Sequence, residues 1–221
     1  MSLWDHSYSL LDGKVTVLVH EDLDAGLGGT LFDGSVALTA FVERLVVEKG
    51  ISNVVENKVF IELGAGCGFP GLFVGKLGGR VILTDVGGPA VDLLLENIEK
   101  NELTATAQAK ALDWFSEKDL DEIAQIGGGR FDYILAADTI YSEDAVEPFL
   151  RVCVRLSQPS TQILFAHPRA RVPKASEKFW NLVGNYFTVE KIQAERFVKD
   201  WTPESKQFLN ERQGVFILRL K

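Results

Sequence analysis

The sequence predicts an α/β fold, a single-domain Rossmann-like structure with a seven-stranded, mostly parallel sheet and helices on both faces. From residue 59 onward, short apolar runs alternate with longer amphipathic segments, which is typical of parallel strands joined by crossover helices. The run 59–63 leads into a glycine-rich turn of the kind at which open α/β sheets bind ligands. Two strand-like runs near the C-terminus, 186–192 and 214–220, indicate an antiparallel pair added at the sheet edge.

The N-terminal part of the chain precedes this alternation. Residues 8–11 and 14–19 are β-like runs, and Asp12-Gly13 between them favours the positive φ angles of a two-residue hairpin turn. A glycine-rich stretch follows at 26–29. Apolar residues then recur at helical spacing as far as Glu48, which predicts the first long helix.

The remaining elements alternate regularly. β-Branched and aromatic runs bounded by glycine or polar residues favour strands, and apolar residues spaced three or four apart favour helices. The expected strands are 59–63, 80–84, 105–110, 131–136, 161–166, 186–192 and 214–220, and the expected helices are 70–78, 89–101, 117–126, 143–157 and 174–184.

Length and composition limit the organisation and the partners. The chain has 221 residues, 46% of them hydrophobic, which suits one substantial core. We expect residues 1–50 to form a hairpin and helix extension packed on a core domain of residues 51–221. The net charge of −8 and the lack of a long basic run argue against nucleic acid. No apolar run approaches the roughly 18 residues that span a bilayer, so we expect no membrane partner.

Two cysteines, Cys67 and Cys153, indicate reduced thiols and no disulfide framework. Reduced thiols indicate the cytoplasm, with the nucleus as a second compartment. We also expect a monomer. The chain has three histidines, and their scatter along the sequence predicts no metal site.

The glycine-rich turn after residue 63 is the first candidate for a cofactor site. Its glycines let the backbone approach a ligand, and the next expected strand ends at Asp85, an acid that can bind ribose hydroxyls. Gly66-x-Gly68-x-x-Gly71 followed by Asp85 satisfies the dinucleotide fingerprint, so a nicotinamide-dependent oxidoreductase stays open. The order acid-Leu-Gly-x-Gly-x-Gly from Glu62, however, resembles motif I of the seven-strand S-adenosylmethionine-dependent methyltransferases. An acid there would repel a pyrophosphate and attract an ammonium or sulfonium.

Two further groups of residues follow expected strands, Leu112-Asp113-Trp114 and Ala136-Ala137-Asp138-Thr139-Ile140-Tyr141. With them the chain resembles the family 16 methyltransferases, a methyltransferase-like group rich in enzymes that modify lysines of non-histone proteins. The resemblance covers roughly residues 26–192. Its most specific part is the Asp-x-x-Tyr pattern of Asp138 and Tyr141.

The resemblance implies S-adenosylmethionine as the cofactor and a protein carrying the acceptor lysine as the substrate. It implies that the methionine end lies against the glycine turn, the ribose against the acid of the second strand, and the adenine against an aromatic residue. Phe32 stands where the family usually has tryptophan, and it keeps the apolar contact without the indole N–H. The cofactor-binding residues are then Phe32, Glu62, Gly64, Ala65, Gly66, Gly68, Asp85, Asp113, Trp114 and Ala137.

The same resemblance assigns the acceptor site to Asp138 and Tyr141, where the carboxylate would align the incoming amine and the ring would flank it. Without it, the sequence indicates equally well that Asp138 caps the next helix and that Tyr141 packs beneath that helix. Trp114 can be a core aromatic, and Asp113 a cap. Acceptors other than lysine also stay open, namely arginine, histidine or a small molecule, as does a catalytically inactive binding module of the same fold.

Overall fold

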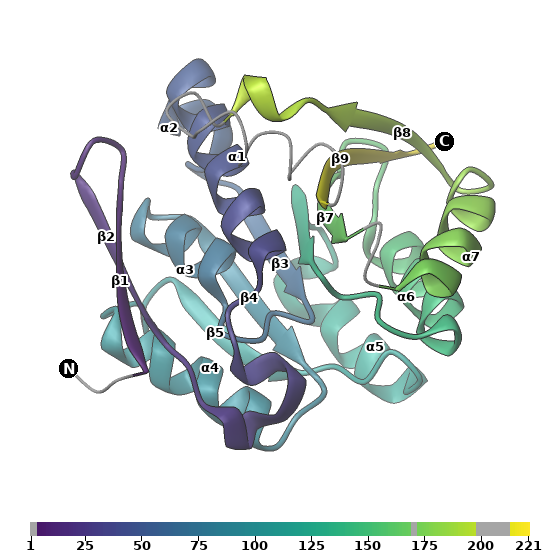
Figure 1. Ribbon diagram of the computed structural model, residues 1–221, viewed down its shortest axis with the longest axis horizontal. Helices are drawn as coiled ribbons and strands as arrows, with labels where there is room; N and C mark the ends of the chain where they lie inside the picture. The colour runs from purple at the N-terminus through teal and green to yellow at the C-terminus, as the bar shows by residue number, and fades with distance from the viewer. Residues whose placement is uncertain (1–3, 169–171, 198–212) are drawn as a thin grey trace.

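The computed structural model describes residues 4–168, 172–197 and 213–221. A seven-stranded sheet crosses the middle of the molecule, and a separate two-stranded hairpin lies beside it (Figure 1). The strands of the main sheet are β3 (Val59–Leu63), β4 (Arg80–Asp85), β5 (Ala107–Ala111), β6 (Tyr133–Ala137), β7 (Gln162–Pro168), β8 (Phe187–Ile192) and β9 (Gln213–Leu220).

The order of the strands is β5-β4-β3-β6-β7-β9-β8. Strands β3 to β7 are parallel, whereas β9 runs antiparallel to both β7 and β8. The predicted fold class is confirmed, including the antiparallel addition at the sheet edge. Within that addition the last strand of the chain inserts between β7 and β8. Because the chain moves outward from β3 to β5 and then returns to β6, the strand order reverses between β3 and β6, where open α/β sheets form a ligand crevice.

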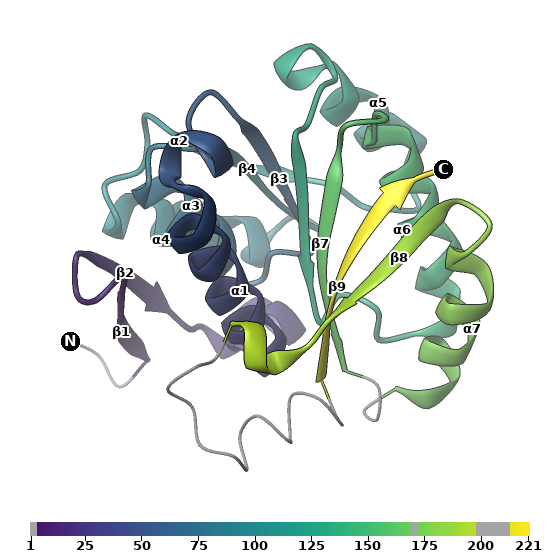
Figure 2. The ribbon, with the colours of Figure 1, turned by 90° about the horizontal axis from the view of Figure 1, so that it is seen from above.

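Helices cover both faces of the sheet (Figure 2). One face carries α1, α3 and α4, and the other carries α5, α6 and α7. Each face has its own apolar cluster, so the sheet is buried on both sides, as a parallel sheet requires. The helices are α1 (Asp33–Lys49), α2 (Ile51–Val54), α3 (Phe69–Lys76), α4 (Pro89–Lys100), α5 (Glu117–Gln125), α6 (Glu143–Leu156) and α7 (Pro173–Val183).

The N-terminal hairpin pairs β1 (Asp5–Leu10) with β2 (Val15–His20) in an antiparallel register. The hairpin is confirmed, but the two-residue turn is wrong. Leu10 pairs with Val15, which leaves a loop of four residues. Leu11 adopts a φ of 51°, and its backbone N–H donates to the Glu43 side chain, which removes Leu11 from the ladder.

The hairpin packs on α3 and α4, and α1 packs on β6, β7 and β9. Between them the chain forms the short 3₁₀ segment η1 (Leu23–Gly29), the dark purple turns at the bottom of Figure 1. The division of the chain into residues 1–50 and 51–221 stays a prediction.

Most element boundaries differ from those expected by one or two residues. The helix expected at 70–78 ends at Lys76, because Gly78 takes a φ of 86° and closes the helix with a left-handed residue. Within the described residues no single helix is long and apolar enough to span a membrane, and only the bent pair of η1 and α1 meets the length and composition criteria jointly.

Candidate active site

A cavity of about 450 Å³ opens at the carboxyl ends of β3, β4, β5 and β6, where the strand order reverses. This volume is within the usual range for a small-molecule site. Ten of the twelve residues predicted for the site line the cavity: Phe32, Gly64, Ala65, Gly66, Asp85, Asp113, Trp114, Ala137, Asp138 and Tyr141.

The glycine turn forms one wall, and its backbone explains its composition. Gly64, Gly66 and Gly68 have φ angles of 58°, 54° and 79°, in the left-handed region that favours glycine. A Cβ on Gly66 would lie 2.7 Å from the carbonyl oxygen of Gly28 in η1. The turn therefore needs glycine at 66 for two reasons, its own conformation and the close approach of η1.

The other two predicted residues, Glu62 and Gly68, lie outside the lining. A Cβ on Gly68 would meet the side chains of Leu94 and Leu83, so Gly68 faces the core. The side chain of Glu62 is 1% exposed and accepts a hydrogen bond of 2.8 Å from the backbone N–H of Gly71. Glu62 therefore supports the start of α3 from beneath the glycine turn.

The pKa of Glu62 is raised to about 8, mainly by burial. The hydrogen bond from the Gly71 N–H lowers this pKa, and the negative charge of Asp85 raises it, with both effects included in that value. Neutral Glu62 is therefore the major form at pH 7.

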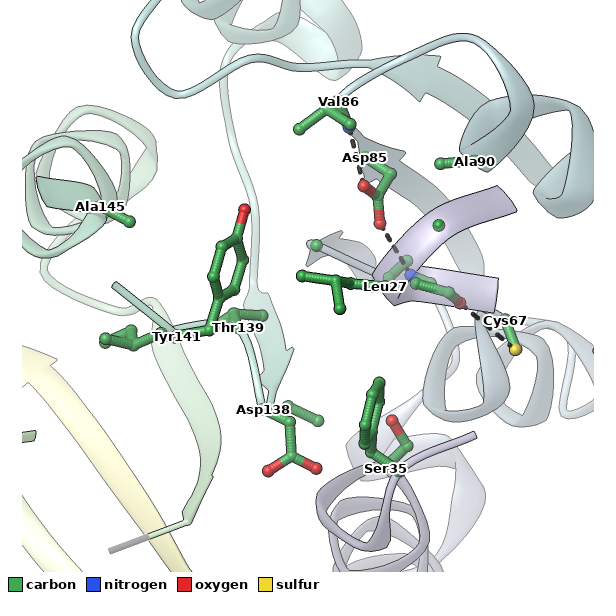
Figure 3. A pocket seen from close by; sticks show the side chains of 18 of the residues that line it. Leu27, Ser35, Cys67, Asp85, Val86, Ala90, Asp138, Thr139, Tyr141 and Ala145 are labelled. Atoms are coloured by element: carbon green, nitrogen blue, oxygen red, sulfur yellow. Dashed lines mark hydrogen bonds between the residues drawn. The ribbon is translucent and has the colours of Figure 1, made fainter. Parts of the chain in front are cut away.

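Asp85 lies at the end of β4 with its carboxylate fixed at both oxygens. One oxygen accepts from Gly66 N–H at 2.8 Å and the other from Val86 N–H at 2.8 Å (Figure 3). These bonds hold the carboxylate between the glycine turn and the β4–α4 loop. This is the strand end at which a ribose diol is bound in open α/β folds.

Asp113 and Trp114 follow β5. Asp113 accepts a hydrogen bond of 2.9 Å from the backbone N–H of Phe115, so it stabilises its own turn as well as facing the cavity. Trp114 is partly buried, with its ring edge-on to Phe149 at 5.2 Å between centroids. A Cβ on Gly64 would be 3.3 Å from the Trp114 ring, so the indole reaches the glycine turn.

Asp138 and Tyr141 follow β6. Asp138 has a φ of 54°, a conformation rare outside glycine that aspartate tolerates better than most residues. Its carboxylate accepts from the backbone N–H of Gly34, in the first turn of α1, at 2.7 Å. Figure 3 shows Asp138 and Tyr141 pointing in opposite directions from the backbone, and the Tyr141 side chain is 56% exposed. The two residues thus border different parts of the cavity.

The sequence did not predict that η1 forms a wall of the cavity, which we call its roof. Ala25, Gly26, Leu27 and Gly28 of η1 line it, and Leu27 is 71% exposed at the mouth. The glycine-rich stretch at 26–29 is visible in the sequence, but only the contact of Gly28 with Gly66 gives it a role.

Cys67 also lines the cavity, and burial raises the pKa of its thiol to about 12. A thiol with so high a pKa is a poor nucleophile at neutral pH, so Cys67 acts as a small packing residue. Across the residues that the structure describes, no group of three or more His, Cys, Asp or Glu side chains could hold a metal ion.

Comparison with known proteins shows similarity to methyltransferases. A family model described as lysine methyltransferase matches residues 12–185. Protein N-lysine methyltransferase METTL21A of Mus musculus is 31% identical over 205 residues, which are 90% of this chain and 87% of that protein. EEF1A lysine methyltransferase 3 of Xenopus tropicalis is 24% identical over 190 residues, covering 86% of this chain and 79% of the relative.

Solved structures share the fold at low sequence identity. The O-methyltransferase from Bacillus cereus, in complex with SAH, has a TM-score of 0.61 and 18% identity, and the match covers 90% of this chain and 86% of that one.

Proposed function

This chain belongs to the lysine methyltransferase family, and we propose that the cavity at the glycine turn binds S-adenosylmethionine and transfers its methyl group to a lysine of a protein substrate. The observation that carries the proposal is the charge of the lining. Asp85, Asp113 and Asp138 line the cavity, and no Lys, Arg or His is among the described lining residues. Both ligands in the proposed reaction bring cationic groups, the sulfonium and ammonium of the cofactor and the ammonium of the acceptor.

The described residues fit this cofactor. Asp85 is placed to accept from the ribose hydroxyls. Gly64, Ala65 and Gly66 line the cavity, and a Cβ on either glycine would crowd its neighbours. Trp114 offers an apolar face to adenine, and Asp113 an acceptor for its amino group. Phe32 and Ala137 complete the binding surface in the proposal. Glu62 and Gly68 act through the shape of the turn.

The structure argues against a dinucleotide at the same place. A pyrophosphate needs backbone N–H groups at the helix N-terminus. In α3, Pro70 has no N–H, and Gly71 already donates to Glu62 at 2.8 Å. The first turn of α3 therefore offers few N–H donors to a pyrophosphate.

When bound, S-adenosylmethionine supplies an electrophilic methyl on its sulfonium. The protein must supply a neutral amine, because a lysine with a pKa of about 10.4 costs roughly 4 to 5 kcal/mol to deprotonate at pH 7. Burial against apolar walls lowers a lysine pKa by roughly 3 to 5 units. Tyr141, Ile140 and Ala145 provide such walls beside the β6 end.

Asp138 has two roles in this proposal. Its carboxylate attracts the incoming ammonium, which aligns the acceptor before the proton leaves to water. A nearby carboxylate favours the charged amine, so Asp138 is not the base that removes the proton. Through Gly34 it also fixes the start of α1, next to Phe32 in the cavity wall. Tyr141 flanks the acceptor at the opposite side.

The acceptor identity is tested by chemical analysis of the product. The purified protein is incubated with cell extract and methyl-tritiated S-adenosylmethionine, and the labelled proteins are hydrolysed to amino acids. We expect label in methyllysine of a non-histone protein. Label confined to methylarginine, methylhistidine or small molecules would contradict the lysine assignment, and binding of cofactor without any transfer would indicate an inactive binding module.

We also propose that the protein acts as a monomer in the cytoplasm, with the nucleus as a second compartment, and without nucleic-acid or membrane partners. The buried free thiols of Cys67 and Cys153 support a reducing compartment. Light scattering after size exclusion tests the oligomeric state, and fractionation of cells tests the location.

A further inference from the structure

Two buried asparagines, Asn97 within α4 and Asn101 at the C-terminal cap of α4, bind strand β2 of the N-terminal hairpin. They lie one helical turn apart, with side chains 0% and 1% exposed. Asn97 accepts from the backbone N–H of His20 at 2.7 Å and donates to its carbonyl at 3.0 Å. Asn101 makes the same pair of bonds with Leu18, at 2.9 Å and 2.6 Å. Each side-chain amide therefore binds the backbone N–H and carbonyl of one β2 residue, as a neighbouring strand would.

The two asparagines differ in their third hydrogen bond. Asn101 donates to the backbone carbonyl of Asn97 within α4, at 2.8 Å. Asn97 donates to the carbonyl of Cys67, inside the glycine turn, at 3.0 Å. Asn97 thus connects β2 directly to the wall of the cavity, and Asn101 does not.

We propose that Asn97 is a positioning residue for the cofactor, because it fixes the Cys67 peptide of the glycine turn and ties β2 to it. The inference rests on the proposed function of the cavity. The turn is held from β4 by the bond between Asp85 and Gly66 and from α4 by Asn97. Without Asn97, the carbonyl of Cys67 loses this hydrogen bond, and within the turn the Cys67–Gly68 peptide keeps the bond from the Gly68 N–H to the Ala65 carbonyl at 2.8 Å. The left-handed glycines on either side of Cys67 then resist a change in the carbonyl direction less than other residues would.

The same residue positions the roof of the cavity. The chain leaves β2 at His20 and forms η1 within a few residues, where Gly28 contacts Gly66. A Cβ on Gly28 would lie 3.1 Å from the Gly66 Cα, so the two segments meet backbone to backbone. Asn97 binds both His20, at the end of β2, and Cys67 in the glycine turn. It thereby fixes the distance between η1, which follows β2, and the glycine turn.

The test compares Asn97→Ala with Asn101→Ala. Each substitution removes three hydrogen bonds of a buried side chain, two of them to β2, and the two sites lie in α4 and at its C-terminal cap. We expect similar losses in Tm. By calorimetric titration well below Tm, we expect Asn97→Ala to raise the Kd for S-adenosylhomocysteine about tenfold and Asn101→Ala to change it less than about twofold. With saturating substrate, KM for S-adenosylmethionine should rise in Asn97→Ala while kcat stays close to wild type.

Equal Kd values for the two variants would overturn the positioning role, because a purely structural asparagine would affect both alike. Failure of the wild-type protein to bind S-adenosylhomocysteine would instead overturn the proposed cofactor site.

Hydrogen exchange of the wild-type protein gives a second test if Asn97→Ala does not fold. Coupling is reciprocal, so the ligand should slow exchange of the His20 N–H, which donates to Asn97 and lies in a strand that does not line the cavity. We expect slowing of several-fold in residues 15–20 and none in residues 187–192. Unchanged exchange in β2 on ligand binding would contradict the inference.

Discussion

The carboxylate of Asp138 accepts a hydrogen bond of 2.7 Å from the backbone N–H of Gly34, across 104 residues of sequence. The bond joins the end of β6 to the first turn of α1, where the helix dipole favours a negative charge. The sequence left open that Asp138 caps the helix that follows it, but Ser142 caps α6. Asp138 instead binds the first turn of α1, and it also lines the cavity.

Two substitutions separate these roles of Asp138. Asp138→Asn keeps an acceptor for Gly34 and tolerates the left-handed backbone, so we expect a Tm close to wild type and cofactor binding largely intact. Because the charge is lost, we expect kcat/KM to fall about tenfold or more, or ~1.4 kcal/mol of transition-state stabilisation.

Asp138→Ala should lose the same activity and, in addition, about 1 kcal/mol of stability, since the hydrogen bond that caps the Gly34 N–H is removed. Methyl transfer and thermal unfolding are measured on both variants. Wild-type activity in Asp138→Asn would show that the charge of Asp138 has no part in the reaction.

Asp85→Ala tests the ribose site. It removes the carboxylate that binds Gly66 and Val86 and is placed for the ribose hydroxyls, so we expect the Kd for S-adenosylhomocysteine to rise about tenfold or more. The matched control is Asp92→Ala, which removes the same charge from an exposed position on α4 outside the cavity. Similar changes in Kd in the two variants would show that Asp85 affects binding only through the net charge of the protein, and would contradict a ribose contact.

Gly66→Ala tests the contact between the glycine turn and η1. Alanine there meets a φ of 54° and places its Cβ 2.7 Å from the Gly28 carbonyl oxygen. Gly78→Ala is the control, because Gly78 has a φ of 86° and no heavy atom within 4 Å of its Cβ position. Both should lose about 1 to 2 kcal/mol of stability from the left-handed backbone.

Of these two variants, we expect only Gly66→Ala to lose cofactor binding in a calorimetric titration. If it bound as tightly as Gly78→Ala, close contact of η1 with the turn would be unnecessary for the site.

Glu62→Gln tests the buried carboxyl beneath the turn. The folded state raises the pKa of Glu62 from 4.5 to about 8, so folding favours the protonated form. The unfolded chain loses this proton at lower pH, and wild-type stability should therefore fall as the pH rises from 4.5 to about 8. Glutamine keeps an acceptor for Gly71 and does not titrate.

Thermal unfolding across this pH range should show a flatter profile for Glu62→Gln than for wild type. Parallel profiles would mean that Glu62 is not protonated in the folded protein.

The strands and the glycine turn were predictable because they depend on local signals. Val59–Leu63 is apolar at every position except Glu62, which is typical of a buried strand. The turn after it is left-handed and needs glycine. The side of the sheet to which Glu62 points could also be predicted, because side chains alternate along a strand. Phe60 belongs to the apolar cluster on the α3 face, and Ile61 and Leu63 belong to the cluster on the opposite face. Glu62 therefore points to the same face as Phe60, toward α3.

The remaining features depend on contacts between distant segments, which no local pattern specifies. The Gly28 contact with Gly66 and the bond from Gly34 to Asp138 arise only once α1 and η1 are docked on the sheet. The hairpin loop was mispredicted for the same reason, because a side chain of α1, Glu43, binds Leu11.

Parallel calorimetric titration of the wild-type protein with S-adenosylmethionine, S-adenosylhomocysteine and NAD tests the central claim most directly. The acidic lining and the occupied N–H of Gly71 predict micromolar binding of the first two ligands and no heat from NAD. Binding of NAD, or binding of none of the three, would contradict the assignment of this cavity to methyl transfer.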